Sequence, residues 1–446
     1  MRLLVPSLVP SWVKKAQEAL RRLLGEVYLV GGAVRDLALG REPKDLDFAT
    51  PLRPEEVARR FEAAGLPVGL SGAAWGTVFT VLEVEGQRAE VEITTYRREI
   101  AYVGRHPVVE WSSSVLEDLA RRDFTVNAMA IAADGTLVDP FGGLEDLKAG
   151  VVRAVGDPKA RFEEDPLRVV RALRFAARYG WRIEERTRRG MAATAQLARE
   201  RVTLPRLGQE VGKGLVSANP GAFLRGLHEL GLLYHLLPEL AEGPHGPAHV
   251  LLQNPLHHPE GDVLSHLIRV VDRARALGAG ELAAWAALLH DVGKPATATP
   301  DPQGWFRFPG HDVVGAEMVA GIAARLGWPK AWREAIETAV RLHMRPLQAP
   351  TPRAVRRFQA EAGEHLALLE TVCRADGEGR REDLEAWFQV STPVEPLLRG
   401  RDLLALGVPP GPGMGALLKR AYELQLELGL TSKEELLEAL GLFANA

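Results

Sequence analysis

The sequence predicts an α+β protein in which a small mixed-sheet head precedes a mostly α-helical neck, body and tail. Residues 28–47 read as a strand, a tight turn, a helix and a second extended segment. Residues 90–97, EVEITTYR, alternate apolar and polar side chains as a strand does. Beyond the head, long stretches have the residue spacing of helices. At 446 residues the chain exceeds one hydrophobic core, so length alone suggests about three domains.

The composition is that of a soluble globular protein, because 46% of the residues are hydrophobic and 25% are charged. The single cysteine, Cys373, excludes an internal disulfide framework and fits a reducing cytoplasm. No apolar run approaches the ~20 residues that span a membrane, and the N-terminal segment does not have the pattern of a signal peptide. The net charge of −3 argues against general binding to polyanions.

The first strand–turn–helix segment predicts a site for an anion. Residues 28–30, YLV, form the expected strand, and Gly31 and Gly32 follow it. Glycines carry no side chain, so the backbone can approach a phosphate closely. The helix expected at about 33–39 ends at Gly40 and directs its N-terminus toward that phosphate.

Paired carboxylates follow this predicted anion site. Asp45 and Asp47 are two residues apart in an extended segment, so both side chains face the same side of the sheet. Two carboxylates beside a phosphate suit two-metal phosphoryl transfer. Glu92, between the apolar Val91 and Ile93, is a candidate third carboxylate. The alternatives are a glycine turn with a solvated acidic loop, and an outward-facing charge at Glu92.

The ordered motifs GGAVRD (31–36) and DLD (45–47) resemble the head of the class II nucleotidyltransferases, the family of bacterial CCA-adding enzymes and poly(A) polymerases. The resemblance implies that Asp45 and Asp47 are catalytic and bind two Mg²⁺ ions, with Glu92 as a weaker candidate ligand. It also implies that the triphosphate is held by Gly31, Gly32 and Arg35.

A second motif, RRDFTVNA at residues 121–128, is predicted to contact the nucleotide. Asp123 could accept hydrogen bonds from ribose hydroxyls while the arginines bind phosphate. In the family that it resembles, this motif contacts the ribose, which implies that role for Arg122, Asp123 and Asn127. A helix cap with salt bridges is the alternative. Turn residues within 138–150 close the head, whose expected extent is 1–145.

The next motif, EDPLRVVRALRF at residues 164–175, is predicted to select the base. We expect Asp165 and Arg168 to be neighbours on one face of a helix with Pro166 in its first turn. A carboxylate acceptor beside a guanidinium donor matches the pairing edges of cytosine and adenine, and opposes those of uracil and guanine. The block resembles the family's protein template, which implies nucleotide binding by Asp165, Arg168, Arg171 and Arg174. A surface ion pair is the alternative.

Arginine remains dense up to residue 206, and this region suits an RNA backbone, with a solvated helix face as the alternative. We expect residues 146–250 to form a helical neck and body that contact tRNA.

A second site is predicted in residues 251–380, after a stretch rich in proline, glycine and histidine. Histidines and carboxylates there suit a divalent cation of unknown identity. Their order resembles the HD phosphohydrolases, and HPEGD (258–262) recurs in bacterial CCA enzymes that carry this domain. The implied metal ligands are His266, His290, Asp291 and Asp376, and the additional residues are Lys294, His311 and His343. We interpret His228, His235, His245, His249 and His365 as ordinary core or surface residues.

Residues 381–446 are expected to form a helical tail that packs on the body and makes some RNA contact, because two amphipathic segments flank the turn 407–415. Residues 98–114 lack the acidic DGxYxD pattern common in CCA enzymes, which puts the nucleotide range in doubt.

The motifs together favour a cytoplasmic tRNA nucleotidyltransferase that adds C, C and A from CTP and ATP without a nucleic-acid template, and that carries an HD phosphohydrolase acting on esters such as 2′,3′-cyclic phosphates. Addition of only A or only CC, or poly(A) synthesis, are the alternatives within this chemistry. A phosphohydrolase whose head is a nucleotide sensor, and a non-catalytic RNA-binding protein, are the alternatives outside it.

Overall fold

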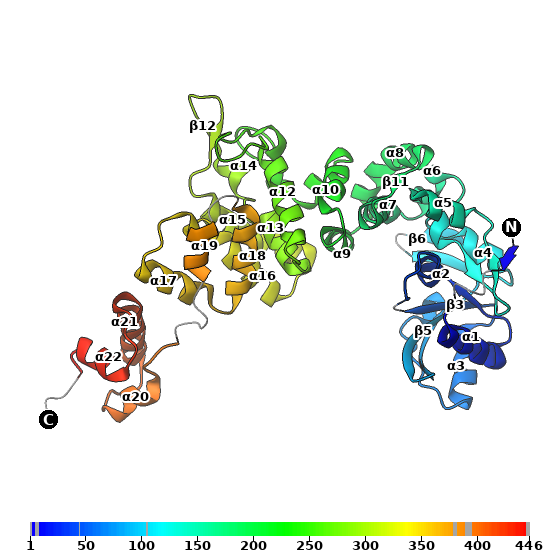
Figure 1. Ribbon diagram of the computed structural model, residues 1–446, viewed down its shortest axis with the longest axis horizontal. Helices are drawn as coiled ribbons and strands as arrows, with labels where there is room; N and C mark the ends of the chain where they lie inside the picture. Colours follow the sequence, from blue (N-terminus) through cyan, green and yellow to red (C-terminus); the bar gives the residue numbers. More distant parts are fainter. Residues whose placement is uncertain are drawn as a thin grey trace. The chain divides into compact units, whose positions relative to one another are not determined.

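The computed structural model describes residues 2–4, 9–43, 45–103, 106–377, 381–388 and 395–442. The chain forms two compact units, Met1–Leu232 and Leu233–Ala446. Figure 1 labels their helices and strands. The first unit carries the sheet and the second is almost entirely helical, which confirms the predicted α+β class.

A seven-stranded mixed sheet forms the core of the head, with the strand order β1-β9-β8-β2-β3-β5-β4. Strand β3 pairs with β2 in antiparallel register and with β5 in parallel register. The strands of the sheet are β1 (Arg2–Leu4), β2 (Tyr28–Val30), β3 (Leu46–Thr50), β4 (Thr77–Val84), β5 (Gln87–Thr95), β8 (Ala130–Ile131) and β9 (Thr136–Val138). A separate hairpin is formed by β6 (Arg97–Val103) and β7 (His106–Trp111).

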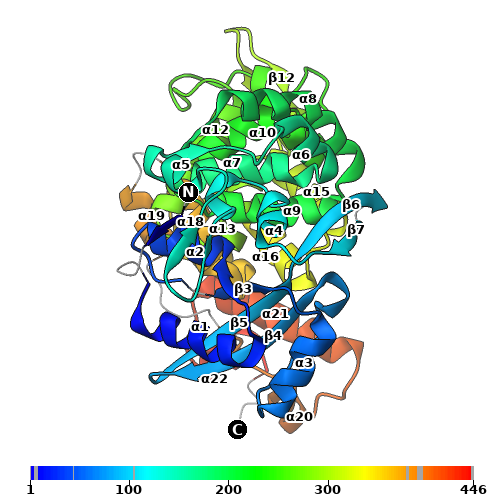
Figure 2. The same cartoon turned by 90° about the vertical axis from the view of Figure 1, so that its right-hand side faces the viewer.

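Helices cover this sheet because their apolar faces need a partner. Helices α1 (Ser11–Leu24) and α3 (Pro54–Ala63) pack on each other and on β4, as Figure 2 shows in blue. Helix α2 (Gly31–Ala38) packs on β2, β3 and β8. It begins at Gly31, two residues before the expected start, so both glycines lie in its first turn. The remaining helical segments of the head are η1 (Ala73–Trp75), α4 (Val115–Ala120), η2 (Thr125–Asn127) and α5 (Gly143–Ala149).

The selecting motif forms two helices rather than one. Asp165 ends α6 (Pro158–Glu164) in an extended conformation, with φ −137° and ψ 97°, and α7 (Leu167–Tyr179) begins after Pro166. A residue that precedes proline is disfavoured in the helical region, which explains the break. The expectation that Asp165 and Arg168 share one helical face was therefore wrong.

Helix α7 is anchored to the head by aromatic packing. The ring of Phe175 makes an edge contact with that of Phe124, at 5.5 Å between centroids. The rest of this unit consists of short strands and helices: β10 (Val151–Val152), β11 (Arg182–Ile183), α8 (Glu185–Arg201), α9 (Leu204–Leu215) and α10 (Pro220–Glu229). Because α7 packs on α9, it joins the head to the helical part of the same unit.

The second unit is built around a helical core in which α12, α13, α16 and α18 pack together. Its elements up to that core's last helix are α11 (Leu232–Leu236, which starts at the division), η3 (Pro238–Leu240), η4 (Ala248–Val250), α12 (Val263–Ala276), α13 (Glu281–Leu289), α14 (Lys294–Thr297), β12 (Thr299–Pro300), β13 (Phe306–Arg307), α15 (His311–Leu326), α16 (Lys330–Leu342), η5 (Arg345–Leu347), α17 (Pro352–Ala362), η6 (Gly363–His365) and α18 (Leu366–Asp376). Within the described ranges, no helix combines the length and apolarity that a membrane crossing requires.

The tail has a small apolar core of its own, formed around Leu403 and Leu436. Its helices are α19 (Arg381–Phe388), α20 (Gly400–Ala405), α21 (Pro412–Leu428) and α22 (Lys433–Ala439). Arg356 of α17 donates to the carbonyl of Leu426 at 2.8 Å, so the end of α21 packs on α17 within the second unit. This agrees with the predicted packing role, and the RNA contact stays a prediction.

Candidate active sites

The predicted carboxylates of the head lie on two neighbouring strands. Asp45 immediately precedes β3, Asp47 is the second residue of that strand, and Glu92 on β5 pairs with Asp47 in parallel register. Residues paired across strands present their side chains on the same face. All three carboxylates line one cavity, so the third position predicted from the sequence lies beside the first two.

The electrostatics of this group favour a bound cation. Burial, followed by the charges of Glu92 and Asp45, raises the pKa of Asp47 to about 6, although Arg122 opposes the shift. Burial also raises the pKa of Glu92. Buried carboxylates that repel one another gain from a divalent cation placed between them. The chemistry of the donor set therefore suits a divalent cation, although these three carboxylates are not among the described groups whose donor atoms all lie within 4.8 Å of one another.

A cavity of about 450 Å³, here called the arginine-lined cavity, opens on the other side of Asp47. Its lining consists of Gly31, Gly32, Arg35, Asp47, Arg121, Arg122, Asp123, Asn127, Asp165, Leu167, Arg168, Arg171, Phe175 and Arg206. Every residue predicted to bind nucleotide is among them except Arg174. Such a concentration of guanidinium groups suits phosphate oxygens.

The glycine pair forms a wall of this cavity. Gly31 has φ +69°, and a Cβ at this position would lie 2.6 Å from Nη1 of Arg122. Arg122 in turn donates to buried Asp118 at 3.0 Å, which fixes its guanidinium. Gly31 is therefore required both by its backbone conformation and by the close approach of an arginine.

Arg35 belongs to a hydrogen-bonded network that runs from α2 to the second motif. Its guanidinium donates to Asn127 Oδ1 at 2.7 Å, and Asn127 donates to Asp123 Oδ1 at 2.9 Å. Arg171 binds the other oxygen of Asp123 through two hydrogen bonds of 2.7 and 3.0 Å. Although burial opposes it, Arg171 lowers the pKa of Asp123 to about 2. The ion pair foreseen as an alternative for Asp123 is thus present, and it orients the side chains that line the cavity.

The two proposed base-selecting residues face the same cavity from the break between α6 and α7. Arg168 is buried and donates to Glu164 at 2.9 Å and to the carbonyl of Arg121 at 3.0 Å. Asp165 lies 4.0 Å from Arg206. The break directs both Asp165 and Arg168 into the arginine-lined cavity, although they do not sit on one helix.

Arg174 differs from the other arginines of this motif. It is buried, forms an ion pair with Glu210 of α9, and packs over the ring of Phe175 at 4.8 Å. It is not part of the described cavity lining. Of the three arginines spaced by three residues, Arg168 and Arg171 therefore line the cavity, and Arg174 points elsewhere.

The second unit brings the predicted HD residues together. His266 Nε2 lies 3.1 Å from Asp376 Oδ1 and 3.4 Å from Asp291 Oδ2, and His290 Nε2 lies 3.2 Å from the same Asp291 oxygen. Lys294 binds this oxygen at 2.6 Å. These residues come from α12, from the segment after α13 and from the end of α18.

The other oxygen of Asp291 faces two further histidines. His311 Nε2 lies 3.1 Å and His343 Nε2 lies 3.4 Å from Asp291 Oδ1. Both nitrogens are buried and lack a hydrogen bond of good geometry. Among the described residues, the groups whose donor atoms lie within 4.8 Å of one another are His258–Glu260–His266, His266–His290–Asp291 and Asp291–His311–His343. Buried imidazole nitrogens converging on a carboxylate fit divalent transition metals.

The orientation of the imidazoles also fits a metal site. His290, His311 and His343 direct Nδ1 at backbone carbonyls of Ala287, Phe308 and Val340, at 2.7–2.8 Å. These contacts leave Nε2 of each ring free to act as a ligand. His266 instead directs Nδ1 at Glu260 Oε1, at 2.6 Å. Burial lowers the pKa of His266, but Asp376 and Glu260 outweigh burial and raise it to about 9.

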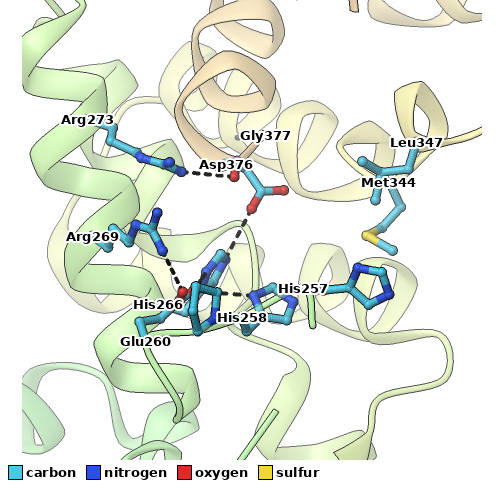
Figure 3. A pocket seen from close by; sticks show the side chains of 11 residues that line it. His257, His258, Glu260, His266, Arg269, Arg273, Met344, Leu347, Asp376 and Gly377 are labelled. Carbon is cyan, nitrogen blue, oxygen red and sulfur yellow. Dashed lines mark hydrogen bonds and ion pairs between the residues drawn. The ribbon is translucent and has the colours of Figure 1, made fainter. Parts of the chain in front are cut away.

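A cavity of about 420 Å³ has His266 and Asp376 of this group in its lining, and Figure 3 shows both side chains. Glu260 also lines the cavity and accepts a hydrogen bond of 2.7 Å from Arg269, and Arg273 donates to the carbonyls of Ala375 and Asp376. The sequence singled out the HPEGD motif but gave Glu260 no role. The hydrogen bond to His266 becomes visible only when the loop before α12 folds back on that helix. His228, His235, His245, His249 and His365 lie outside the three donor groups of the described chain.

Comparison with known proteins identifies the class of each region. The family of the poly A polymerase head domain matches residues 27–153, the probable RNA and SrmB-binding site of polymerase A matches 180–243, and the HD domain matches 263–378. The first unit is therefore a nucleotidyltransferase, and the second unit contains an HD domain.

The relatives show the family. A multifunctional CCA protein of Halorhodospira halophila is 34% identical, over 80% of this chain and 84% of its own. An A-adding tRNA nucleotidyltransferase of Deinococcus radiodurans is 36% identical, over 89% of this chain and 90% of its own. The crystal structure of the Bacillus stearothermophilus CCA-adding enzyme in complex with CTP is 25% identical, covers 98% of each chain and has a TM-score of 0.70. The chain belongs to the tRNA nucleotidyltransferase and bacterial poly(A) polymerase family, in the group that carries an HD domain.

Proposed function

We propose that this enzyme adds C, C and A to the 3′ end of tRNA from CTP and ATP, without a nucleic-acid template. One observation carries the proposal. Asp47 lines two cavities: one also holds the other two predicted carboxylates, and the other is the arginine-lined cavity, which includes Asp165 and Arg168. The relatives named as CCA and A-adding proteins, and the neighbour solved with CTP, support the same reaction class.

The residues divide the reaction between them. The terminal ribose hydroxyl of the RNA forms a bond to the α-phosphorus of the nucleotide, and the bond from that phosphorus to pyrophosphate breaks. Asp45, Asp47 and Glu92 would hold Mg²⁺, which when bound activates the hydroxyl and neutralises charge on the phosphate oxygens. Arg35 and Arg122 would orient the triphosphate through charge-assisted hydrogen bonds.

Base selection follows from complementary hydrogen bonding. Asp165 would accept from the exocyclic amine of cytosine or adenine, and Arg168 would donate to the adjacent ring nitrogen. Uracil and guanine would oppose both groups, and a mispaired buried polar group costs about 1–3 kcal/mol. Arg171 and Asn127 would hold Asp123 toward the ribose, because both donate hydrogen bonds to its carboxylate.

The HD domain is proposed to hydrolyse phosphate esters such as 2′,3′-cyclic phosphates. His266, His290, Asp291 and Asp376 would hold one divalent cation. His311 and His343, which approach the second oxygen of Asp291, would hold a further cation together with it. Such a cation supplies an activated water at neutral pH. Lys294 would balance the charge of Asp291.

Addition of A alone is the second candidate. The A-adding relative of Deinococcus radiodurans aligns over 89% of this chain, and residues 98–114 lack the acidic pattern that CCA enzymes commonly carry in this loop. Residues 104–105 of this loop lie outside the described residues, so the structure does not test the prediction from the loop.

The decisive experiment uses purified protein with tRNAs that lack one, two or three terminal residues, together with labelled CTP, ATP or both. CCA addition predicts extension of all three tRNAs to full length when both nucleotides are present. Addition of A alone predicts extension only of the tRNA that ends in CC, and long products would identify a poly(A) polymerase. No extension of any tRNA would contradict the proposal.

A further inference from the structure

A row of three paired residues crosses the sheet of the head, from two of the predicted carboxylates to an aromatic ring. Asp47 of β3 is paired with Glu92 of β5, and Glu92 is paired with Phe79 of β4. Paired residues share a face, and neighbouring strands lie about 4.8 Å apart. The ring of Phe79 therefore stands on the carboxylate face, two strands from Asp47.

These residues line a cavity of about 500 Å³, here called the apolar cavity. Its lining consists of Asp45, Asp47, Pro67, Val68, Gly69, Phe79, Thr80, Val81, Glu90, Val91 and Glu92. None of these described lining residues is a lysine or an arginine. The arginine-lined cavity shares only Asp47 with it. A triphosphate is thus attracted to one side of Asp47 and repelled from the other.

Phe79 has partners on both sides although 38% of it is exposed. Its backbone pairs with Glu92 on one side and exchanges two hydrogen bonds of 2.9 Å with Gly69 on the other. A Cβ on Gly69 would lie 3.2 Å from Phe79 Cβ, and one on Gly72 would lie 3.2 Å from Phe79 Cε2. The ring therefore rests against two residues that lack side chains, and this contact fixes its position at the cavity.

We propose that the apolar cavity binds the terminal nucleoside of the RNA that is extended, with its base stacked on Phe79. The inference rests on the proposed nucleotidyl transfer. In that reaction the attacking hydroxyl and the leaving pyrophosphate stand on opposite sides of the α-phosphorus. With the triphosphate among the arginines, the hydroxyl must approach from the side of the apolar cavity. A base and a ribose are uncharged and tolerate the surrounding carboxylates.

Stacking also suits a substrate whose terminal base is not constant. During C, C and A addition the RNA ends first in the residue that precedes CCA and then in C, so hydrogen bonds specific to one base would stall the enzyme. Stacking on an aromatic ring accepts every base, since each has a π-face. The selecting residues Asp165 and Arg168 line the other cavity, where only the incoming nucleotide is read.

Steady-state kinetics of Phe79→Ala test this assignment, with the RNA and CTP varied separately. We expect KM for the RNA to rise roughly tenfold or more, and KM for CTP to stay within about twofold. Phe79→Tyr should restore the wild-type KM. Trp75→Ala is the matched control, because Trp75 is 40% exposed in the same region of the head but does not line the cavity. An unchanged KM for the RNA, or a rise confined to CTP, would overturn the assignment.

A binding measurement separates this inference from the proposed function. An RNA that ends in 2-aminopurine should lose fluorescence on binding the wild-type protein and Phe79→Tyr, and should keep it with Phe79→Ala. RNA extension by the wild-type protein without a Phe79-dependent change would refute the cavity assignment alone. Quenching that depends on Phe79, without extension of any RNA, would refute the proposed function and retain the cavity assignment.

Discussion

At the scale of single residues, the arginines of α7 show how one sequence repeat serves two purposes. Arg168 and Arg171 line the arginine-lined cavity, whereas Arg174 is buried against Glu210 and Phe175. A buried charge that loses its partner is destabilising because it stays desolvated without compensation. The repeat therefore places two arginines at the cavity and one in a structural ion pair.

Replacement of Arg174 is expected to destabilise the first unit without changing nucleotide preference. Arg174→Ala leaves the buried Glu210 without its closest cation, with Arg171 at 3.9 Å and Lys213 at 4.0 Å as its remaining ion pairs. We expect the free energy of unfolding to fall by about 3 kcal/mol. Chemical denaturation measures this loss. The ratio of kcat/KM for CTP over UTP should stay within about twofold at a temperature where the variant is folded. A marked change in that ratio would assign Arg174 to the nucleotide site.

Replacement of Arg168 should have the opposite effect. Arg168→Ala removes the side chain that we propose as the donor to the ring nitrogen, so the preference for CTP and ATP over UTP and GTP should fall by about tenfold or more. Competition assays with mixed nucleotides measure the preference. Arg178→Ala, on the exposed face of the same helix, is the control and should retain the wild-type preference. Equal discrimination in both variants would refute the template role.

Glu260 illustrates a residue that acts through another. It is the hydrogen-bond partner of His266 Nδ1. In the other three histidines of the predicted metal site, Nδ1 instead contacts a backbone carbonyl. In an Asp47→Asn background, Glu260→Gln should lower the affinity of the HD site for Mn²⁺ by about 10- to 100-fold, as measured by calorimetry. Glu364→Gln, at an exposed carboxylate of the same unit, should leave the affinity unchanged.

The same scale shows what the sequence could and could not predict. The carboxylates at 45, 47 and 92 followed from strand alternation, and the structure places them beside one cavity. Phe79 was not predicted as a site residue, because its pairing with Glu92 depends on the register of a hairpin. The partnership of Arg174 with Glu210 was equally hidden, since it joins two helices that are distant in sequence.

At the scale of elements, two local rules decide where the site residues point. Gly31 has φ +69° and lies in the first turn of α2. The sequence had predicted a glycine turn followed by a helix that starts at about residue 33, so the connection is shorter than expected. Asp165 precedes a proline, and the resulting break separates α6 from α7. The predicted single helix ignored this pre-proline effect, although Pro166 made it predictable.

The turn at Gly31 can be tested with a pair of matched variants. Gly31 and Gly40 have nearly equal φ values, +69° and +68°, but a Cβ meets Arg122 at 2.6 Å in the first case and nothing within 4 Å in the second. Both alanine variants should lose about 1 kcal/mol of stability through backbone strain. Only Gly31→Ala should also raise KM for CTP, by about tenfold or more, because it displaces Arg122. Similar kinetics for both variants would show that strain alone matters.

At the scale of the whole molecule, the order of motifs was predicted from the sequence, and each unit carries one of the two expected sites. The expected boundaries near 145, 250 and 380 remain predictions, since the structure divides the chain at 232 and 233. The sequence keeps the apolar spacing of helices across residues 232 and 233, so it gives no sign of this division. The predicted boundary near 250 instead followed the stretch rich in proline, glycine and histidine before α12. The sites are built from different units, so each activity should survive loss of the other.

Two single substitutions test this independence. Asp47→Asn should lower nucleotide addition by at least about 100-fold, since it removes a ligand for the metal, and should leave phosphohydrolase activity within about twofold. His290→Asn should do the reverse. In a chelating buffer, Asp47→Asn should also raise the melting temperature of the first unit, because it removes a charge whose burial, followed by repulsion from Glu92 and Asp45, raises the pKa of Asp47. If either substitution abolished both activities while the protein stayed folded, the two sites would have to work as one.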